Sequence, residues 1–166
     1  MHMYDLYTPM TENSGEHFSF EDAKKTVLEG LAPMGEEYLS HLKDGFEHGW
    51  IDVYENQGKR SGAYSWGAYG THPYVLLNYQ GTLNDVFTLA HEMGHALHSW
   101  YSDETQPYIY AGYRIFVAEV ASTCNEALLI HHLLKKAKDP KNKALPPAYP
   151  GPPLVSYPLP WLSVSL

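Results

Sequence analysis

Residues 82–100 read TLNDVFTLAHEMGHALHSW, and this stretch decides most of what the sequence indicates about the fold. Thr82 is followed three residues later by Asp85, a pair typical of the start of a capped helix. Apolar residues then recur at helical spacing and give one face that extends to about Trp100. They are Val86, Leu89, Ala90, Met93, Ala96 and Leu97. The stretch therefore predicts a long amphipathic helix.

The middle of this helix carries His91-Glu92-Met93-Gly94-His95. Residues four apart on an α-helix are rotated by about 40°, so His91 and His95 project from one face and can present two imidazoles to one ion. Glu92 lies about 100° around the helix, where it is not a third ligand but can reach a water on the metal. The motif predicts a zinc site with Glu92 as the catalytic general base.

A catalytic zinc site normally has three protein ligands and a water, so a third ligand must come from another element. We choose Glu119, which lies among small apolar residues on a later predicted helix, because a carboxylate buried there needs a charge partner. A surface carboxylate on an amphipathic helix is the alternative. Glu126, seven residues later, is predicted to support a ligating histidine by accepting its hydrogen bond. One Zn²⁺ per chain is expected.

Other metal sites with related motifs fit less well. A metzincin would need glycine at position 98 and histidine at position 101, where the sequence has His98 and Tyr101. A ferritin-like di-iron site would need a second Glu-x-x-His unit, which is absent from the sequence. Because three ligands already suffice, His98 is assigned a packing or supporting role beside the metal rather than a ligand role.

The remaining sequence predicts a mainly helical fold with a small strand segment. Ser19 is a candidate N-cap for a helix through Leu31, and a second helix can open at Pro33 and end near Gly49. The glycine-punctuated segment 52–79 favours loops and short strands, with 74–79 as the best strand. A further helix, which carries both glutamates of the site, is expected over 115–138.

Composition and charge limit the partners and the compartment. The net charge of −8 and the absence of a dense basic stripe argue against nucleic-acid binding. No apolar run approaches the roughly 20 residues of a membrane-spanning helix, and no signal peptide is visible. The single cysteine, Cys124, fits a reducing compartment, so a cytoplasmic location is expected. The oligomeric state stays open.

The composition changes near the C-terminus. Residues 144–166 contain no charged side chain and much proline, and they show neither helical nor strand periodicity. We therefore expect a domain over 1–142 and a non-native or disordered tail over 143–166.

Five stretches together resemble the oligoendopeptidase F family, bacterial relatives of thimet oligopeptidase. The resemblance extends from about Tyr4 to Asn142, which is far more specific than the five-residue motif. The stretches are GKRSGAYS (58–65), THPYVLLNY (71–79), HEMGHALHS (91–99), QPYIYAGY (106–113) and FVAEVAST (116–123).

The resemblance implies a zincin-like, neurolysin-like helical core, with zinc held by His91, His95 and Glu119 and with Glu92 as the base. It also implies cleavage of short peptides in a deep channel. Segment 71–79 would then be the strand beside which the peptide lies, adding backbone hydrogen bonds to it.

Four further residues are candidates for substrate contact. For each of them, half-buried packing with a hydrogen-bonded polar tip is an equally good interpretation. They are His72, Tyr79, Tyr110 and Tyr113.

The chain departs from the family pattern near Lys143, and it begins where the family is already well into its length. The resemblance therefore implies that 1–142 is a partial peptidase catalytic domain. By resemblance, the family's oxyanion-stabilising residues lie beyond this point. A fragment that covers the zinc site but lacks catalytic activity is therefore the alternative to a working zinc metalloendopeptidase.

Overall fold

The computed structural model describes residues 17–137, and its helices and strands lie within one compact unit, Gly15–Lys136. The described part is mainly helical with a small sheet, as the sequence predicts. Its helices and strands are α1 (Phe20–Gly30), the 3₁₀ turn η2 (Ala32–Met34), α2 (Glu36–Glu47), β1 (Ile51–Asp52), β2 (Tyr64–Trp66), β3 (Tyr74–Leu76), α3 (Leu83–Thr105), α4 (Tyr108–Ala111) and α5 (Ile115–Lys136).

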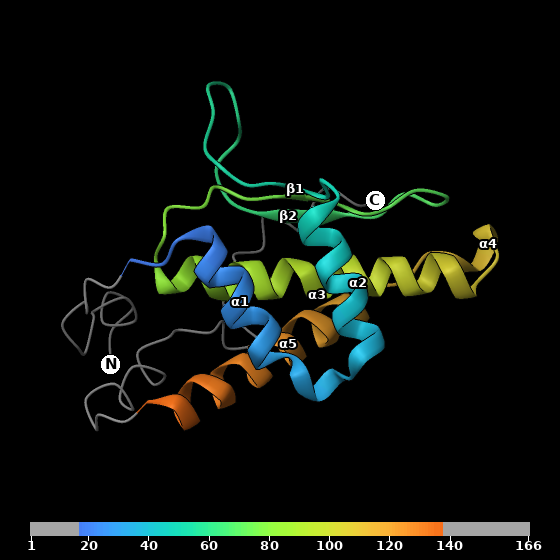
Figure 1. The fold of residues 1–166 in the computed structure, drawn as a ribbon. Helices are drawn as coiled ribbons and strands as arrows, with labels where there is room; N and C mark the ends of the chain where they lie inside the picture. Colours follow the sequence, from blue (N-terminus) through green and yellow to red (C-terminus); the bar gives the residue numbers. More distant parts are fainter. Residues whose placement is uncertain (1–16, 138–166) are drawn as a thin grey trace, which may run out of the picture. The chain divides into compact units, whose positions relative to one another are not determined.

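Helix α3 is the central element. The sheet runs along one side of it, and α1 and α5 lie on the other side (Figure 1). A helix covered on two sides buries more than one stripe of residues. Accordingly, much of α3 has almost no exposed surface; its buried residues are Val86, Phe87, Leu89, Ala90, His91, Glu92, Met93, Gly94, Ala96, Leu97 and Ser99. The metal motif therefore lies inside the core.

A glycine within the motif allows α3 and α5 to approach closely. A Cβ at Gly94 would lie 2.7 Å from Ser122 Cα and 3.1 Å from the Ala121 carbonyl oxygen. Beside this contact, the Asn125 side-chain amide donates to the Ala90 carbonyl at 3.0 Å. The close crossing places the N-terminal part of α5 beside the two histidines of α3.

The sheet has the order β1-β3-β2, so β3 is its central strand. It pairs in parallel with β1, with Ile51 opposite Val75, and antiparallel with β2, with Ser65 opposite Val75. Both sides of β3 are therefore taken by other strands. Strand pairing therefore contradicts the expectation of peptide pairing for residues 74–76, and for the rest of segment 71–79 it stays a prediction. Among the described strands, β2 lies at an edge of the sheet.

The predicted helix starts are confirmed where a side chain caps them. The Ser19 hydroxyl accepts from the Asp22 backbone N–H, and Thr82 and Asp85 form a reciprocal capping box. Two bounds differ. Gly35 at φ 93° separates a 3₁₀ turn around Pro33 from α2, so that helix begins at Glu36. Helix α3 continues past Trp100 to Thr105, because no glycine or proline interrupts it before Pro107.

Two further expectations concern the rest of the chain. The tail at 143–166 lies outside the described residues, so the domain boundary at 142 stays a prediction. Within residues 17–137, no helix combines the length and the apolar character needed to cross a bilayer.

Candidate metal centre

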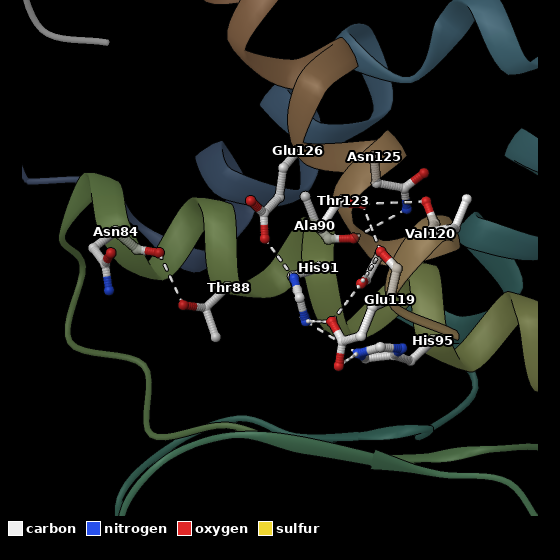
Figure 2. Close-up of polar contacts among 11 residues, drawn as sticks. Asn84, Thr88, Ala90, His91, His95, Glu119, Val120, Thr123, Asn125 and Glu126 are labelled. Carbon is white, nitrogen blue, oxygen red and sulfur yellow. Dashed lines mark hydrogen bonds and ion pairs between the residues drawn. The ribbon is translucent and has the colours of Figure 1, made fainter. Parts of the chain in front are cut away.

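Three side chains from two helices converge on one point. The Nε2 atoms of His91 and His95 lie 3.0 Å apart on one face of α3. The Glu119 carboxylate reaches them from α5, with Oε2 3.6 Å from His91 Nε2 and Oε1 3.8 Å from His95 Nε2. Figure 2 shows the three side chains pointing toward one another. Two imidazoles and a carboxylate are thus placed to share one cation.

The spacing of these atoms fits a zinc ion. Zinc bonds of about 2.0–2.1 Å in a tetrahedral site separate neighbouring ligand atoms by about 3.3 Å. The two histidine Nε2 atoms lie 3.0 Å apart, and the two Glu119 oxygens approach them to 3.6 and 3.8 Å, distances close to that value. The donor types also suit zinc, which accepts imidazole nitrogen and carboxylate oxygen. The residues therefore fit the metal that the motif predicts.

Glu126 supports the first histidine. It lies on α5 two turns beyond Glu119 and forms a buried hydrogen bond with His91 Nδ1 (Figure 2). A proton held on Nδ1 leaves Nε2 as the atom that faces the cluster. Burial lowers the pKa of His91, but the hydrogen bond to Glu126 and the neighbouring carboxylates outweigh it, so the pKa lies above its usual value.

Glu92 is a buried carboxyl group, 7% exposed. Its Oε2 atom has no hydrogen-bond partner among the described residues. Burial raises its pKa to about 7, opposed by His91 and reinforced by the charges of Glu119 and Glu126. A carboxyl group with a pKa near neutrality can both accept and release a proton, which a general base and acid must do.

The pKa of His95 is shifted in the opposite direction to that of His91. Burial, followed by the neighbouring His91 and His98, lowers its pKa to about 4. Its imidazole is therefore neutral at pH 7, and a neutral imidazole is the form that coordinates a metal.

Sequence reasoning missed three residues of α5 that hold the cluster in place. Asn125 is buried, bonds to α3 and accepts from the Tyr38 hydroxyl at 3.0 Å. The Ser122 hydroxyl donates to Glu119 Oε2 at 3.3 Å, and Thr123 Oγ1 donates to the Glu119 carbonyl. Polar residues recurring within a helix of otherwise apolar composition were the available signal, since a buried polar side chain needs a partner.

His98 and Tyr113 lie together just beyond the cluster. Their rings meet edge to face with centroids 4.2 Å apart, and the Tyr113 hydroxyl bonds to Ser99 Oγ. His98 Nε2 is buried without a hydrogen-bond partner in the described part of the chain. His98 is not in the group of possible ligands, and its packing or supporting role stays a prediction.

The other candidates for substrate contact are not among the three possible ligands. His72 stacks on Trp50, and its Nδ1 bonds to the Pro73 carbonyl at 2.8 Å. Tyr79 is buried and donates to the Phe18 carbonyl, whereas Tyr110 on α4 is exposed. Tyr79 follows the packing interpretation in this structure, and substrate contact by these residues stays a prediction.

Comparison with known proteins extends across most of the chain. The model of the family described as Peptidase family M3 matches residues 1–148. Oligopeptidase PepF of Bacillus subtilis is 57% identical over 143 residues, which are 86% of this chain and 21% of that protein. The oligoendopeptidase F homolog of Lactococcus lactis subsp. lactis is 54% identical over 141 residues, covering 85% of this chain and 23% of that protein.

A solved structure gives the same result for the fold. A crystal structure from Chlamydophila abortus superposes with a TM-score of 0.79 at 44% identity, covering 90% of this chain and 26% of that chain. The chain thus spans about a fifth of the length of the curated relatives named above. The resemblance to oligoendopeptidase F is confirmed, and the chain belongs to peptidase family M3.

Proposed function

We propose that this chain binds one zinc ion through His91, His95 and Glu119 and hydrolyses peptide bonds in short peptides. The observation that carries the proposal is the convergence of these three side chains beside a buried carboxyl group, Glu92, whose Oε2 atom has no hydrogen-bond partner among the described residues. When bound, zinc would polarise the scissile carbonyl and acidify a water molecule.

The residues of the chain would move the protons. Glu92 would accept a proton from the attacking water and then donate it to the leaving amine, for which a pKa of about 7 is well suited. Glu126 would keep the Nδ1 proton on His91 and so keep Nε2 directed at the cluster. Asn125 would hold α5 against α3 while these transfers occur.

The sheet offers a place for the peptide backbone. Strand β2 is an edge strand that packs on α3, and an extended peptide can add to such an edge through main-chain hydrogen bonds. Antiparallel pairing is slightly more stable than parallel pairing. The N-terminal half of a peptide would then lie at the Trp66 end of β2. The names of the relatives, oligopeptidase and oligoendopeptidase, agree with short peptides as substrates.

A second function deserves the same test. The chain covers only 21% of the B. subtilis relative, so a zinc-binding chain without peptidase activity is the competing proposal. Both functions require zinc, and only the first requires Glu92 to act on a substrate.

The test combines zinc analysis with a cleavage assay on the full 166-residue chain. Elemental analysis is expected to give one zinc per chain, and a quenched fluorescent oligopeptide is expected to be cleaved. Glu92→Gln should lower the rate by roughly 10²- to 10⁴-fold, because it removes the general base. Glu104→Gln, which removes an exposed carboxylate at the end of α3, is the matched control.

The outcomes separate the two functions. Zinc binding without Glu92-dependent cleavage would favour the inactive zinc-binding chain. A chain that takes up no zinc at neutral pH would contradict both.

A further inference from the structure

A pocket with a volume of about 640 Å³ lies beyond the metal centre, at the C-terminal end of α3. Its walls come from the end of β2 and the turn after it, from α3, and from α4 and the residues that follow. Figure 1 shows α4 and the β2–β3 connection near the same end of α3. The pocket is lined by Ser65, Trp66, Gly67, Tyr69, Ser99, Asp103, Tyr108, Ile109, Ala111, Gly112 and Tyr113.

Specific contacts build the walls of this pocket. A Cβ at Gly67 would lie 2.6 Å from Ser99 Cβ, so β2 meets α3 closely one turn after His95. The Ser102 hydroxyl donates to the Ala111 carbonyl at 2.6 Å, and the Tyr69 hydroxyl donates to the Gln106 carbonyl at 3.2 Å. These bonds fix α4 and the β2–β3 connection to α3.

The lining combines aromatic rings with one negative charge. Four of the lining residues are aromatic, and the Tyr69 and Tyr108 rings meet edge to face with centroids 5.3 Å apart. Asp103 is the one charged residue of the lining. It is half-buried, and no ion pair to it occurs among the described residues. Burial and the nearby Glu104 raise its pKa, as expected for a carboxylate that lacks a counter-charge.

We infer that this pocket, here called the aromatic pocket, binds a cationic group of the peptide substrate at Asp103 and the surrounding rings. Aromatic faces attract ammonium and guanidinium groups, and a half-buried carboxylate provides the opposite charge. The inference rests on the proposed function, because it takes a peptide lying along β2 as the molecule that brings the cation.

The position of the pocket indicates which part of the peptide carries that charge. Asp103 follows His95 by eight residues, a rise of about 12 Å along a helix. An extended chain rises about 3.3 Å per residue, so the pocket lies roughly three to four residues from the metal centre. In an antiparallel arrangement on β2, this is the N-terminal side of the cleaved bond. The cation is then either the free N-terminal ammonium of a short peptide or a lysine or arginine side chain near that end.

A calorimetric titration separates these two sources. The full chain carrying Glu92→Gln, with and without zinc, is titrated with four hexapeptides of otherwise neutral sequence. One has a free N-terminus, one is N-acetylated, one is N-acetylated with lysine at position 2, and the last is N-acetylated with norleucine at position 2. Norleucine keeps the length of the lysine side chain and removes its charge.

Asp103→Asn is the test variant, since it keeps the shape of the side chain and removes the charge. It should weaken binding of the cationic peptides by about five- to tenfold, a modest effect because the site is partly exposed. Binding of the neutral peptides should not change. Asp103→Lys should reverse the preference toward a fifth hexapeptide, N-acetylated with glutamate at position 2, which guards against simple loss of folding. Glu47→Gln, which removes an exposed carboxylate on α2 outside the pocket lining, should leave the preference unchanged.

The affinities identify the source of the cation. The peptide with a free N-terminus is compared with its N-acetylated form, and the lysine peptide with the norleucine peptide. The cationic peptide that binds more tightly than its neutral counterpart shows which group enters the pocket. Equal binding of cationic and neutral peptides, or an unchanged preference in Asp103→Asn, would overturn the cationic pocket while leaving the zinc peptidase proposal intact. Failure of every hexapeptide to bind would also overturn the pocket. Zinc content and Glu92-dependent cleavage test the proposed function separately.

Discussion

The N-terminal segment of α5 (115–120) and its C-terminal segment (121–136) have opposite patterns of burial. In the N-terminal segment, four apolar residues are between 47% and 69% exposed: Ile115, Phe116, Val117 and Val120. In the C-terminal segment, Ser122, Asn125 and Glu126 are buried, at 0%, 1% and 7% exposed, beside Leu129 at 0%. The helix therefore exposes apolar side chains in one segment and buries polar ones in the other.

The difference shows that packing partners, rather than residue type, decide burial along this helix. The C-terminal segment lies against α3 and α1, and the buried side chains of Ser122, Asn125 and Glu126 each have a hydrogen-bond partner in or beside the metal centre. Such partners offset the cost of removing polar groups from water. The N-terminal segment presents to solvent a face that the described residues do not cover. Glu119 lies near the junction of the two segments, at the boundary between core and surface.

The largest expected effect is on the free energy of unfolding, and it is seen by comparing one apolar residue from each segment of α5. Leu129→Ala should lower the free energy of unfolding by about 2–5 kcal/mol, because it leaves a cavity against α1. Phe116→Ala, in the N-terminal segment, should change the free energy of unfolding by no more than about 0.5 kcal/mol. Urea unfolding followed by circular dichroism measures both. Equal losses of stability in the two variants would mean that the N-terminal segment is covered in solution. The two segments would then not differ in burial.

A smaller loss of stability is expected where α3 crosses the C-terminal segment of α5. Gly94→Ala should destabilise the chain by about 1–3 kcal/mol, since the new methyl group overlaps the Ser122 backbone. This loss should exceed the gain in helix propensity, about 1 kcal/mol. Gly112→Ala is the control: it has φ −66° and open space around it, so it should be neutral or slightly stabilising. Thermal unfolding of the two variants compares them directly, and a neutral Gly94→Ala would show that the helices can separate at little cost.

Glu126 is a buried polar residue of the C-terminal segment of α5, and its substitution should affect zinc affinity. Glu126→Gln should weaken zinc binding by about 10- to 100-fold, because an amide supports the His91 imidazole less strongly than a carboxylate does. Competition with a chromophoric chelator measures the affinity, with Glu104→Gln as the variant that removes a charge elsewhere. Unchanged affinity in Glu126→Gln would assign Glu126 to packing alone.

The elements with strong local signals were predictable from the sequence. The capping residues Ser19 and Thr82 marked the starts of α1 and α3, and the apolar period showed that α3 is a helix. The helix predicted over 115–138 is found as α5, Ile115–Lys136. The spacing of His91 and His95 placed both imidazoles on one face, because four residues complete about one helical turn. These features depend on neighbours in the chain, so a single sequence contains them.

The features that the sequence could not supply depend on contacts between distant segments. That β3 is the central strand, with β2 at the edge, follows from pairing between residues far apart in the chain, which a single sequence does not show. The contact of Gly94 with Ser122 and the bonds of Asn125 to Ala90 and Tyr38 are of the same kind.

By itself, the sequence determined the helices, the histidine pair and the choice of Glu119, since helical periodicity and the donor preference of zinc are local rules. The tertiary structure alone decided how closely Glu119 approaches the histidines, which strand edge is open, and which aromatic residues line a pocket with Asp103. Those arrangements arise when α5, the sheet and α4 pack on α3, because a packed core fixes distances between residues that the chain itself leaves free.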